Sequence, residues 1–191
     1  MSKFDQSVII AAQKSQAQWG VPASVSLAQF ALESAYGTRM PAGSNNPFGI
    51  KAVAGQPSVT TSTREVINGK SVTVLARFRK FADFNEAFDG HARLLATKAV
   101  YAPAMKAWTV DHDLEKGVKL MGAWYATDPS YAAKILSIIQ GQQLVQYDHA
   151  QPVAAAPAPT PPPIAPTVAP RTNWVAALID LVLNLLKGLR K

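Results

Sequence analysis

Apolar residues recur at helical spacing in the first part of the chain, with polar residues between them. The pattern predicts a first helix over about 3–18. Pro22 suits the first turn of a second helix, because a proline there gives up no helical hydrogen bond. We expect this second helix to run to about Ala35, with Gly37 as its stop.

The spacing of apolar residues changes after 38–58, a loop-like stretch rich in glycine, asparagine and proline. β-branched residues then flank Asn68-Gly69, a pair that suits the left-handed angles of a type I′ turn. If the turn has two residues, Glu65 pairs with Val72. The segment "TSTREVINGKSVTVLARFRKF" therefore predicts a β-hairpin.

Helical spacing returns after the hairpin. Further helices are expected at 84–98, about 111–125 and about 129–146. Asp83 and Glu86 are spaced as a capping box for the first of these, and Asp128-Pro129 supplies an N-cap and a first-turn proline for the last. The predicted fold class is α+β, mainly α: one helical domain over 1–148 with a small β lobe.

The composition changes abruptly after Asp148. Residues 149–172 are rich in proline and alanine without hydrophobic periodicity, as in an extended, semi-rigid linker. Residues 173–191 predict a basic amphipathic helix, too short and too interrupted by polar residues to cross a membrane. On a helical wheel five of its polar residues form one narrow stripe: Asn173, Asp180, Asn184, Lys187 and Lys191. We expect it to lie on anionic lipid, the alternative being that its apolar face docks on the domain or on another tail.

The net charge of +7 favours anionic polymers as partners but does not choose among nucleic acid, lipid and bacterial envelope. The basic residues are dispersed and no nucleic-acid-binding motif accompanies them, so we expect no nucleic-acid partner. The absence of cysteine excludes disulfides, thiolate metal sites and cysteine nucleophiles. The histidines, His91, His112 and His149, lack the spacing of a metal site, and we expect no cofactor.

Glu33 is the one charged residue of "FALESAYG" and falls in the last turn of the second predicted helix. The unsatisfied carbonyl groups of that turn disfavour an ionised carboxylate, so the pKa of Glu33 should be raised. A carboxylic acid with a raised pKa suits general-acid protonation of a glycosidic oxygen. The alternative is an ordinary solvated helix glutamate, which composition and spacing alone do not exclude.

Glu65 offers a second carboxylate, on the more apolar face of the predicted hairpin with Thr63 and Val74. A helix-borne acid that faces a strand-borne carboxylate across a cleft is the arrangement used for glycoside cleavage. The alternative is an edge-strand charge that prevents sheet aggregation.

Several segments, in order, resemble the glucosaminidase domain of glycoside hydrolase family 73, known from autolysins and flagellar peptidoglycan hydrolases. They are "GVPASVSLAQFALESAYG", "SNNPFGIKA", "TREV", "FRKFADFNEAFDGHARLL" and "YATDPSYAAKI", and they cover most of residues 10–146. The resemblance implies a lysozyme-like α+β fold and hydrolysis of the β-1,4 bond between N-acetylglucosamine and N-acetylmuramic acid in peptidoglycan.

The resemblance also implies roles for individual residues. Glu33 matches the general acid of the family, Glu65 its second acidic residue, and Tyr131 a tyrosine important in the site. Tyr125, six residues earlier, is the second choice for that tyrosine and an expected substrate-binding residue, because both tyrosines lie beside the same loop and helix start. In the loop "SNNPFGIK", Asn46 and Phe48 are expected to contact sugar by hydrogen bonding and ring stacking.

The loop departs from the family at Pro47, where leucine or another apolar residue is expected; proline stiffens the loop without removing a chemical group. The second step of the reaction stays open, because either Glu65 activates water or the acetamido group of the substrate attacks the anomeric carbon. We expect Trp108 and Trp124 to be core residues rather than sugar platforms, and His91 to be a helix-surface or hydrogen-bonded core residue.

A cell-wall hydrolase with a basic amphipathic tail and no recognisable signal peptide resembles a bacteriophage or prophage endolysin directed against a Gram-negative host. We therefore expect a monomer, made in the cytoplasm, that reaches peptidoglycan in the periplasm, with residues 173–191 on anionic membrane or lipopolysaccharide. The alternatives are a muramidase that cleaves the other glycosidic bond, and a peptidoglycan- or membrane-binding protein without catalysis.

Overall fold

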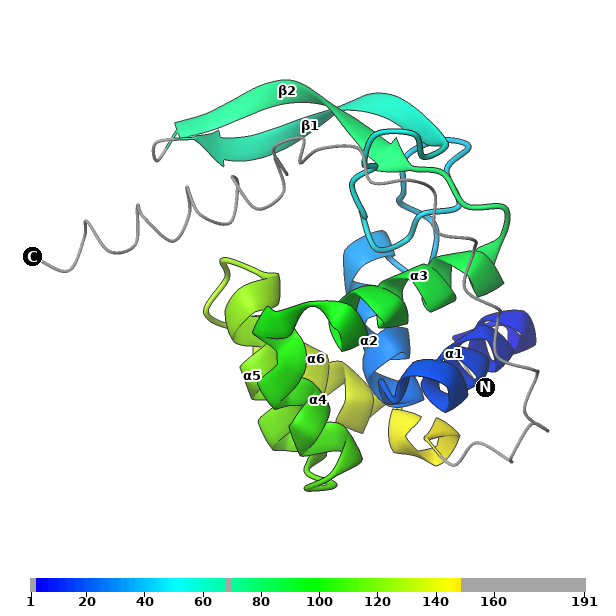
Figure 1. Cartoon of the computed structure of the whole chain (residues 1–191), viewed down its shortest axis with the longest axis vertical. Coiled ribbons are helices and arrows are strands. Elements are labelled where there is room, and N and C mark those ends of the chain that lie inside the picture. Colours follow the sequence, from blue (N-terminus) through cyan, green and yellow to red (C-terminus); the bar gives the residue numbers. More distant parts are fainter. Residues whose placement is uncertain (1–2, 68–69, 149–191) are drawn as a thin grey trace, which may run out of the picture. The chain divides into compact units, whose positions relative to one another are not determined.

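The structure is a computed structural model that describes residues 3–67 and 70–148. Within these ranges it describes the side chains of all residues except those in 64–71. Its elements follow in the order α1 (Gln6–Trp19), α2 (Ala23–Ser34), β1 (Ser58–Ile67), β2 (Lys70–Arg79), α3 (Phe84–Thr97), η1 (Ala99–Tyr101), α4 (Ala102–Thr109), α5 (Leu114–Tyr125), α6 (Tyr131–Gly141) and η2 (Leu144–Tyr147). The helices pack together and the β1–β2 hairpin projects from them, as Figure 1 shows. The predicted class, mainly helical with a small β lobe, is confirmed. The predicted linker at 149–172, the predicted tail helix at 173–191 and the predicted Asn68-Gly69 turn lie outside the described residues.

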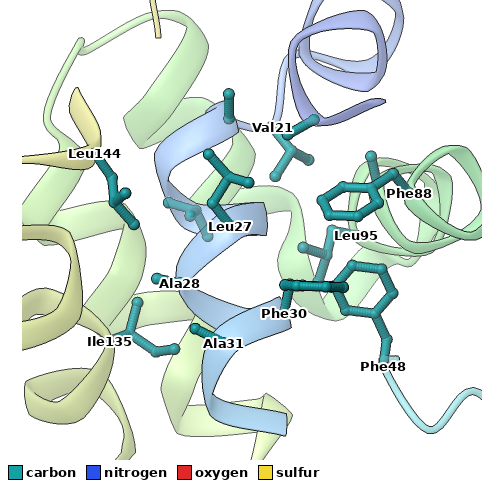
Figure 2. Close-up of a cluster of buried hydrophobic side chains, with 14 of the residues drawn as sticks. Val21, Leu27, Ala28, Phe30, Ala31, Phe48, Phe88, Leu95, Ile135 and Leu144 are labelled. Carbon is teal, nitrogen blue, oxygen red and sulfur yellow. The ribbon is translucent and has the colours of Figure 1, made fainter. Parts of the chain in front are cut away.

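Helix α2 forms the centre of the core. Its residues from Ala23 to Ala31 are buried on all sides. Figure 2 shows Ala28 and Ala31 facing Ile135 of α6, while Phe30 lies toward Phe88 of α3. Small residues on one side of α2 allow close helix packing, and aromatic rings fill the wider space on the other. The position of α2 is therefore fixed by contacts around its whole circumference.

The chain leaves α2 through an unusual turn. The helix ends at Ser34, within one residue of the predicted end at about Ala35, but its C-cap is Ala35 rather than the predicted Gly37. Ala35, Tyr36 and Gly37 all adopt left-handed backbone angles, with φ of 47°, 61° and 80°. The Ser34 hydroxyl holds this turn by donating to the Phe30 carbonyl (2.6 Å) and accepting from the Gly37 amide (2.8 Å). A side-chain hydrogen bond thus replaces the glycine cap as the signal that ends the helix.

The β-hairpin is confirmed with the predicted register. The strands pair antiparallel from Ser58 with Arg79 to Ile67 with Lys70, and Glu65 pairs with Val72. The end of the hairpin nearest the helices is tied to the loop at 44–52: the Ala52 amide donates to the Arg77 carbonyl at 3.0 Å, and the Arg79 amide to the Ile50 carbonyl at 2.8 Å. We call this end the hairpin base. The Arg79 side chain also pairs with Glu86 of α3 at 3.1 Å.

The helix after the hairpin, α3, begins as predicted. Asp83 caps it by accepting from the Glu86 amide at 2.9 Å, although the Glu86 side chain bonds the Ala82 amide rather than completing the box on Asp83. Helix α5 begins at Leu114, later than predicted, because Asp113 caps it. The short elements η1 and α4 were not predicted from the sequence.

Helix α6 differs from prediction at both ends. The Asp128 carboxylate accepts from the Ser130 amide at 2.8 Å, which closes a local turn, so Ser130 rather than Asp128 precedes the helix and Tyr131 is its first residue. The helix ends at Gly141, five residues earlier than predicted, and Gln143 takes a left-handed conformation (φ 55°) before η2. Tyr131 therefore projects from the start of α6.

Two of the predictions about buried aromatic residues fail. Trp108 is buried as expected, and its indole donates to the Leu114 carbonyl at 3.3 Å. Trp124 is instead 53% exposed, and the prediction that it belongs to the core is wrong. His91 is a core residue, but neither of its ring nitrogens has a hydrogen-bond partner, so the expected hydrogen bond is absent from the described structure. Among the described helices none is long and apolar enough to cross a bilayer.

Candidate functional site

Glu33 is the only charged residue of α2 and one of the few residues of this helix that reach solvent. It is the penultimate residue of the helix, as the sequence predicted. The residue is exposed overall, yet protein covers enough of its carboxyl group that burial raises the pKa. The predicted direction is thus confirmed, with burial as the main cause.

Tyr131 contacts this carboxyl group directly. Its hydroxyl donates to Oε1 of Glu33 at 2.7 Å, a hydrogen bond that acts against burial by lowering the pKa of Glu33. The same hydroxyl accepts from the side-chain amide of Gln29 at 3.0 Å. Burial, together with the neighbouring Tyr125 and Glu33, raises the pKa of the Tyr131 hydroxyl, so it remains a neutral donor. The two opposing effects leave Glu33 with a raised pKa and one fixed neighbour.

The position of Tyr131 depends on the junction between α5 and α6. Its ring stacks on Tyr125, the last residue of α5, with centroids 5.4 Å apart. Gly122 permits this close approach, because a Cβ there would lie 3.2 Å from the Ala132 Cβ and 3.4 Å from the Tyr131 ring. The structure thus brings together Glu33, Tyr131 and Tyr125, three of the predicted site residues, from three different helices.

Open space lies on both sides of the Glu33 carboxyl group. One cavity, of about 350 Å³, lies between Glu33 and the hairpin, where Thr61, Thr63 and Phe78 line it. A second, of about 270 Å³, is lined by Glu33, Tyr125 and Tyr131. Glu33 therefore lines two neighbouring cavities, one toward the hairpin and one toward the α5–α6 junction.

Glu65 lies in β1, two positions beyond Thr63. Side chains alternate between the two faces of a strand, so this position belongs to the hairpin face that lines the cleft at Thr61 and Thr63. The Glu65 side chain itself is among those outside the described part. Its backbone position is therefore established, and its contact with substrate stays a prediction.

Asn46 and Phe48, from which we expect sugar contacts, are both buried in the loop at 44–52. Asn46 is 1% exposed, and its amide already donates to the carbonyls of Ile50 (2.8 Å) and Arg79 (2.9 Å) while its oxygen accepts from the Ile50 amide (3.0 Å). Asn46 has no free donor for a sugar, and its bonds hold the hairpin base. Phe48 is 6% exposed, because its ring packs on Phe88 and stacks on His91 with centroids 4.0 Å apart. The sequence pattern therefore located the loop correctly and misassigned the Phe48 ring, whereas Asn46 lines the cavity beside Glu33 and its contact with sugar stays a prediction.

An aromatic row connects this loop to the site. The ring of His91 lies between Phe48, on which it stacks, and Tyr125, which it meets edge to face at 6.2 Å, and Tyr125 in turn stacks on Tyr131. Complete burial lowers the pKa of His91 to about 3, so the ring is neutral near pH 7. No cluster of His, Cys, Asp or Glu in the described part of the chain is arranged to hold a metal ion.

Sequence reasoning missed Gln29 and the cleft-lining residues Arg39, Met40 and Thr61. Gln29 carries a signal in retrospect, since it is a lone amide in the apolar run "SLAQFAL". The cleft-lining residues carry none, because their place depends on how the loop folds against the hairpin.

The comparisons with known proteins point to one family. The glucosaminidase family model, described as mannosyl-glycoprotein endo-beta-N-acetylglucosaminidase, matches residues 10–144. The chain is 38% identical over 135 residues to the exo-glucosaminidase LytG of Bacillus subtilis, covering 68% of this chain and 47% of LytG. It is 39% identical over 130 residues to the peptidoglycan hydrolase FlgJ of Salmonella typhimurium, covering 64% of this chain and 40% of FlgJ.

A solved structure shares the fold. The catalytic domain of the autolysin Auto from Listeria monocytogenes superposes with a TM-score of 0.68 at 28% identity, covering 78% of this chain and 89% of that domain. The chain spans less than half the length of LytG and FlgJ, so the likeness concerns one domain of those proteins.

Proposed function

This chain belongs to the glucosaminidase family of glycoside hydrolases, and from that premise we propose that it cleaves the β-1,4 bond between N-acetylglucosamine and N-acetylmuramic acid in peptidoglycan. The observation that carries the proposal is the Glu33 carboxyl group, which burial makes a weaker acid and Tyr131 holds within an open cleft. The name of FlgJ, a peptidoglycan hydrolase, supports peptidoglycan as the substrate class, and the name of LytG supports glucosaminidase action.

Glu33 acts as the general acid. Because Tyr131 donates to Oε1, the proton of the neutral carboxyl group resides on Oε2, from which it passes to the glycosidic oxygen as the bond to the anomeric carbon breaks. The carboxylate left behind keeps the Tyr131 hydrogen bond, which stabilises the new negative charge. One tyrosine thus orients the acid before the transfer and stabilises its conjugate base afterwards.

Water completes the reaction at the anomeric carbon. In one route Glu65 takes a proton from the attacking water; in the other the acetamido oxygen of the substrate attacks first and water opens the resulting ring. The location of Glu65 on the cleft-lining face of the hairpin supports the first route. Azide tests it: added azide should restore turnover to Glu65→Ala by replacing the activated water, and no rescue would favour the acetamido route.

The two cavities that Glu33 lines support cleavage within a glycan strand. A strand that enters past Thr61 and Thr63 and leaves past Tyr125 would present an internal bond to Glu33. LytG is named an exo-glucosaminidase, so the two modes need to be separated for this chain. Early digests of long strands should contain mid-length fragments, whereas release of single terminal units would assign exo action.

Mass spectrometry of the new reducing ends tests the proposal as a whole. Digests of purified Gram-negative peptidoglycan should show N-acetylglucosamine reducing ends that disappear in Glu33→Gln and persist in Glu115→Gln, a control at an exposed glutamate of α5. N-acetylmuramic acid ends would reassign the enzyme as a muramidase. No new ends with the unmodified protein would leave a binding or membrane-active role.

We further propose that the protein works as an endolysin against a Gram-negative host, made in the cytoplasm and acting in the periplasm. The basic composition of residues 173–191 and their apolar wheel face support attachment to anionic membrane or lipopolysaccharide. Removal of 173–191 should leave cleavage of purified peptidoglycan intact while lowering sedimentation with vesicles that contain anionic lipid. Unchanged vesicle binding would contradict the membrane role.

A further inference from the structure

Gln29 lies one helical turn before Glu33 in α2 and is completely buried. Its side-chain nitrogen donates to the Tyr131 hydroxyl oxygen at 3.0 Å and has a longer contact, 3.7 Å, with the sulfur of Met121. Its side-chain oxygen has no hydrogen-bond partner. The amide therefore makes one strong hydrogen bond, and that bond goes to the tyrosine beside the proposed acid.

The direction of this hydrogen bond determines the direction of the next one. A tyrosine hydroxyl carries a single proton, and at Tyr131 the oxygen already accepts from Gln29. The proton is then directed to Oε1 of Glu33, 2.7 Å away. A hydroxyl that accepts one hydrogen bond becomes a better donor in another, so the chain from Gln29 through Tyr131 to Glu33 is cooperative.

We infer that Gln29 is a positioning residue for hydrolysis: it directs the Tyr131 proton onto Oε1 of Glu33 and so leaves Oε2 to carry the catalytic proton. This inference rests on the proposed function, because it assigns Gln29 a task only if Glu33 is the acid. Gln29 does not touch the substrate, and it acts through the tyrosine.

The unpartnered oxygen of Gln29 is independent support. Burying a carbonyl oxygen without a hydrogen bond costs stability, and an aliphatic residue of similar length would avoid that cost at this position. The protein has an amide side chain at this position, where packing alone would favour methionine or leucine. Proteins accept such a loss of stability mainly at functional sites, which is where Gln29 lies.

The test compares Gln29→Met with Ser26→Ala. Both substitutions remove a fully buried polar side chain of α2 that has an unpartnered oxygen, but Ser26 has no contact with Tyr131 or Glu33 in the described hydrogen bonds. The rate kcat, KM and their pH dependence are measured on soluble glycan strands. Melting temperatures are recorded alongside, and neither variant should melt below the parent.

Gln29→Met should lower kcat by about fivefold, the effect of one weakened hydrogen bond, and leave KM within about twofold. The weaker Tyr131 donor stabilises the Glu33 carboxylate less, so the pKa of Glu33 rises and the alkaline limb of the profile moves up by about half a pH unit. A lower plateau together with a limb at higher pH is not expected from partial unfolding, which would scale the whole profile. Ser26→Ala should leave kcat and the alkaline limb of the profile unchanged.

An alkaline limb and a kcat in Gln29→Met that match those of Ser26→Ala would overturn the inference. So would failure of both Gln29→Met and Gln29→Leu to fold, because the amide would then be structural. Glu33→Gln, measured in parallel, distinguishes failure of the proposed function from failure of the inference. An active Glu33→Gln refutes the proposed function. An inactive Glu33→Gln, together with unchanged kinetics in Gln29→Met, refutes only the inference about Gln29.

Discussion

The two walls of the cleft differ in how firmly the chain holds them. The helical wall places Glu33 on a helix that is buried around its circumference, and Tyr131 on a second helix packed against it. The hairpin wall is a two-stranded sheet that the structure ties to the helices mainly at its base, through the loop at 44–52 and the Arg79–Glu86 pair. A two-stranded sheet gains little stability by itself, so its position depends on these ties.

This difference suggests a division of tasks. Proton transfer requires a donor held within a few tenths of an ångström, and the helical wall provides it. The opposite wall must admit a long polymer, and a lobe anchored at one end can yield to it. The comparison predicts that variants in the helical wall affect chemistry and stability strongly, while variants far out on the hairpin affect them less.

The largest expected contrast is between the two carboxylates. Glu33→Gln should lower kcat by about a thousandfold, because the amide cannot donate the proton to the leaving group. Glu65→Gln, on the less firmly held wall, should lower it by about tenfold to a hundredfold. Release of reducing ends measures both, with thermal unfolding to verify folding. A larger loss in Glu65→Gln would reverse the assignment of the walls.

Two leucines, one in each wall of the cleft, allow the same comparison for the stability of the fold. Leu27 of α2 is completely buried, whereas Leu75 of β2 is 78% exposed. Leu27→Ala should lower the free energy of unfolding by about 3 kcal/mol through cavity formation, and Leu75→Ala should change it by less than about 0.5 kcal/mol. Urea denaturation measures both values. Similar losses in the two variants would mean that the hairpin contributes to the core as much as α2 does.

The hairpin base can be loosened selectively at Asn46. Asn46→Ala removes hydrogen bonds to Ile50 and Arg79 and should cost about 2 kcal/mol, because buried backbone groups lose their partners. Hydrogen exchange should quicken at the Ala52 and Arg79 amides and not in α2. Asn45→Gly is the matched control, since glycine accepts the left-handed angle of Asn45 (φ 48°) and this side chain bonds the Phe81 and Ala82 carbonyls instead. Equal acceleration in the two variants would contradict the anchoring role of Asn46.

The smallest effect concerns His91, whose pKa of about 3 lies below its ordinary value of 6.5. Between these values the unfolded chain binds a proton that the folded chain does not, so stability falls as the pH drops through this window, by about 1 kcal/mol per pH unit. His91→Phe should flatten that slope in melts between pH 7 and pH 5. An unchanged slope would mean that other groups set the acid sensitivity.

The parts of the site that the sequence predicted are those with local signals. Glu33 could be placed near the helix end by its spacing, and the register of Glu65 followed from a two-residue turn. The hydrogen bonds of Asn46 and the burial of Phe48 could not be predicted, because only the folded loop shows that the amide is bonded to backbone groups and that the ring is covered. Exposure of a loop residue is decided by tertiary contacts, which periodicity does not contain.

Tertiary contacts also decide the burial of the two tryptophans and the hydrogen bond of Gln29, which the sequence could not predict. Trp108 and Trp124 look alike in a helical pattern, and only the packing of α4 against α5 buries the first and leaves the second exposed. The hydrogen bond of Gln29 spans 102 residues of sequence, a separation across which single-sequence patterns give no pairing information.

The turn after Ser34 has a practical consequence for engineering a more heat-resistant form of this domain. Alanine and tyrosine both disfavour the left-handed angles they adopt at 35 and 36, each at a cost of about 1 kcal/mol. Glycine or asparagine at 35 fits those angles better, although the extra freedom that glycine gives the unfolded chain offsets part of its gain. Position 35 is thus a place to raise the operating temperature while the side chains of Glu33, Tyr131 and Gln29 are all kept.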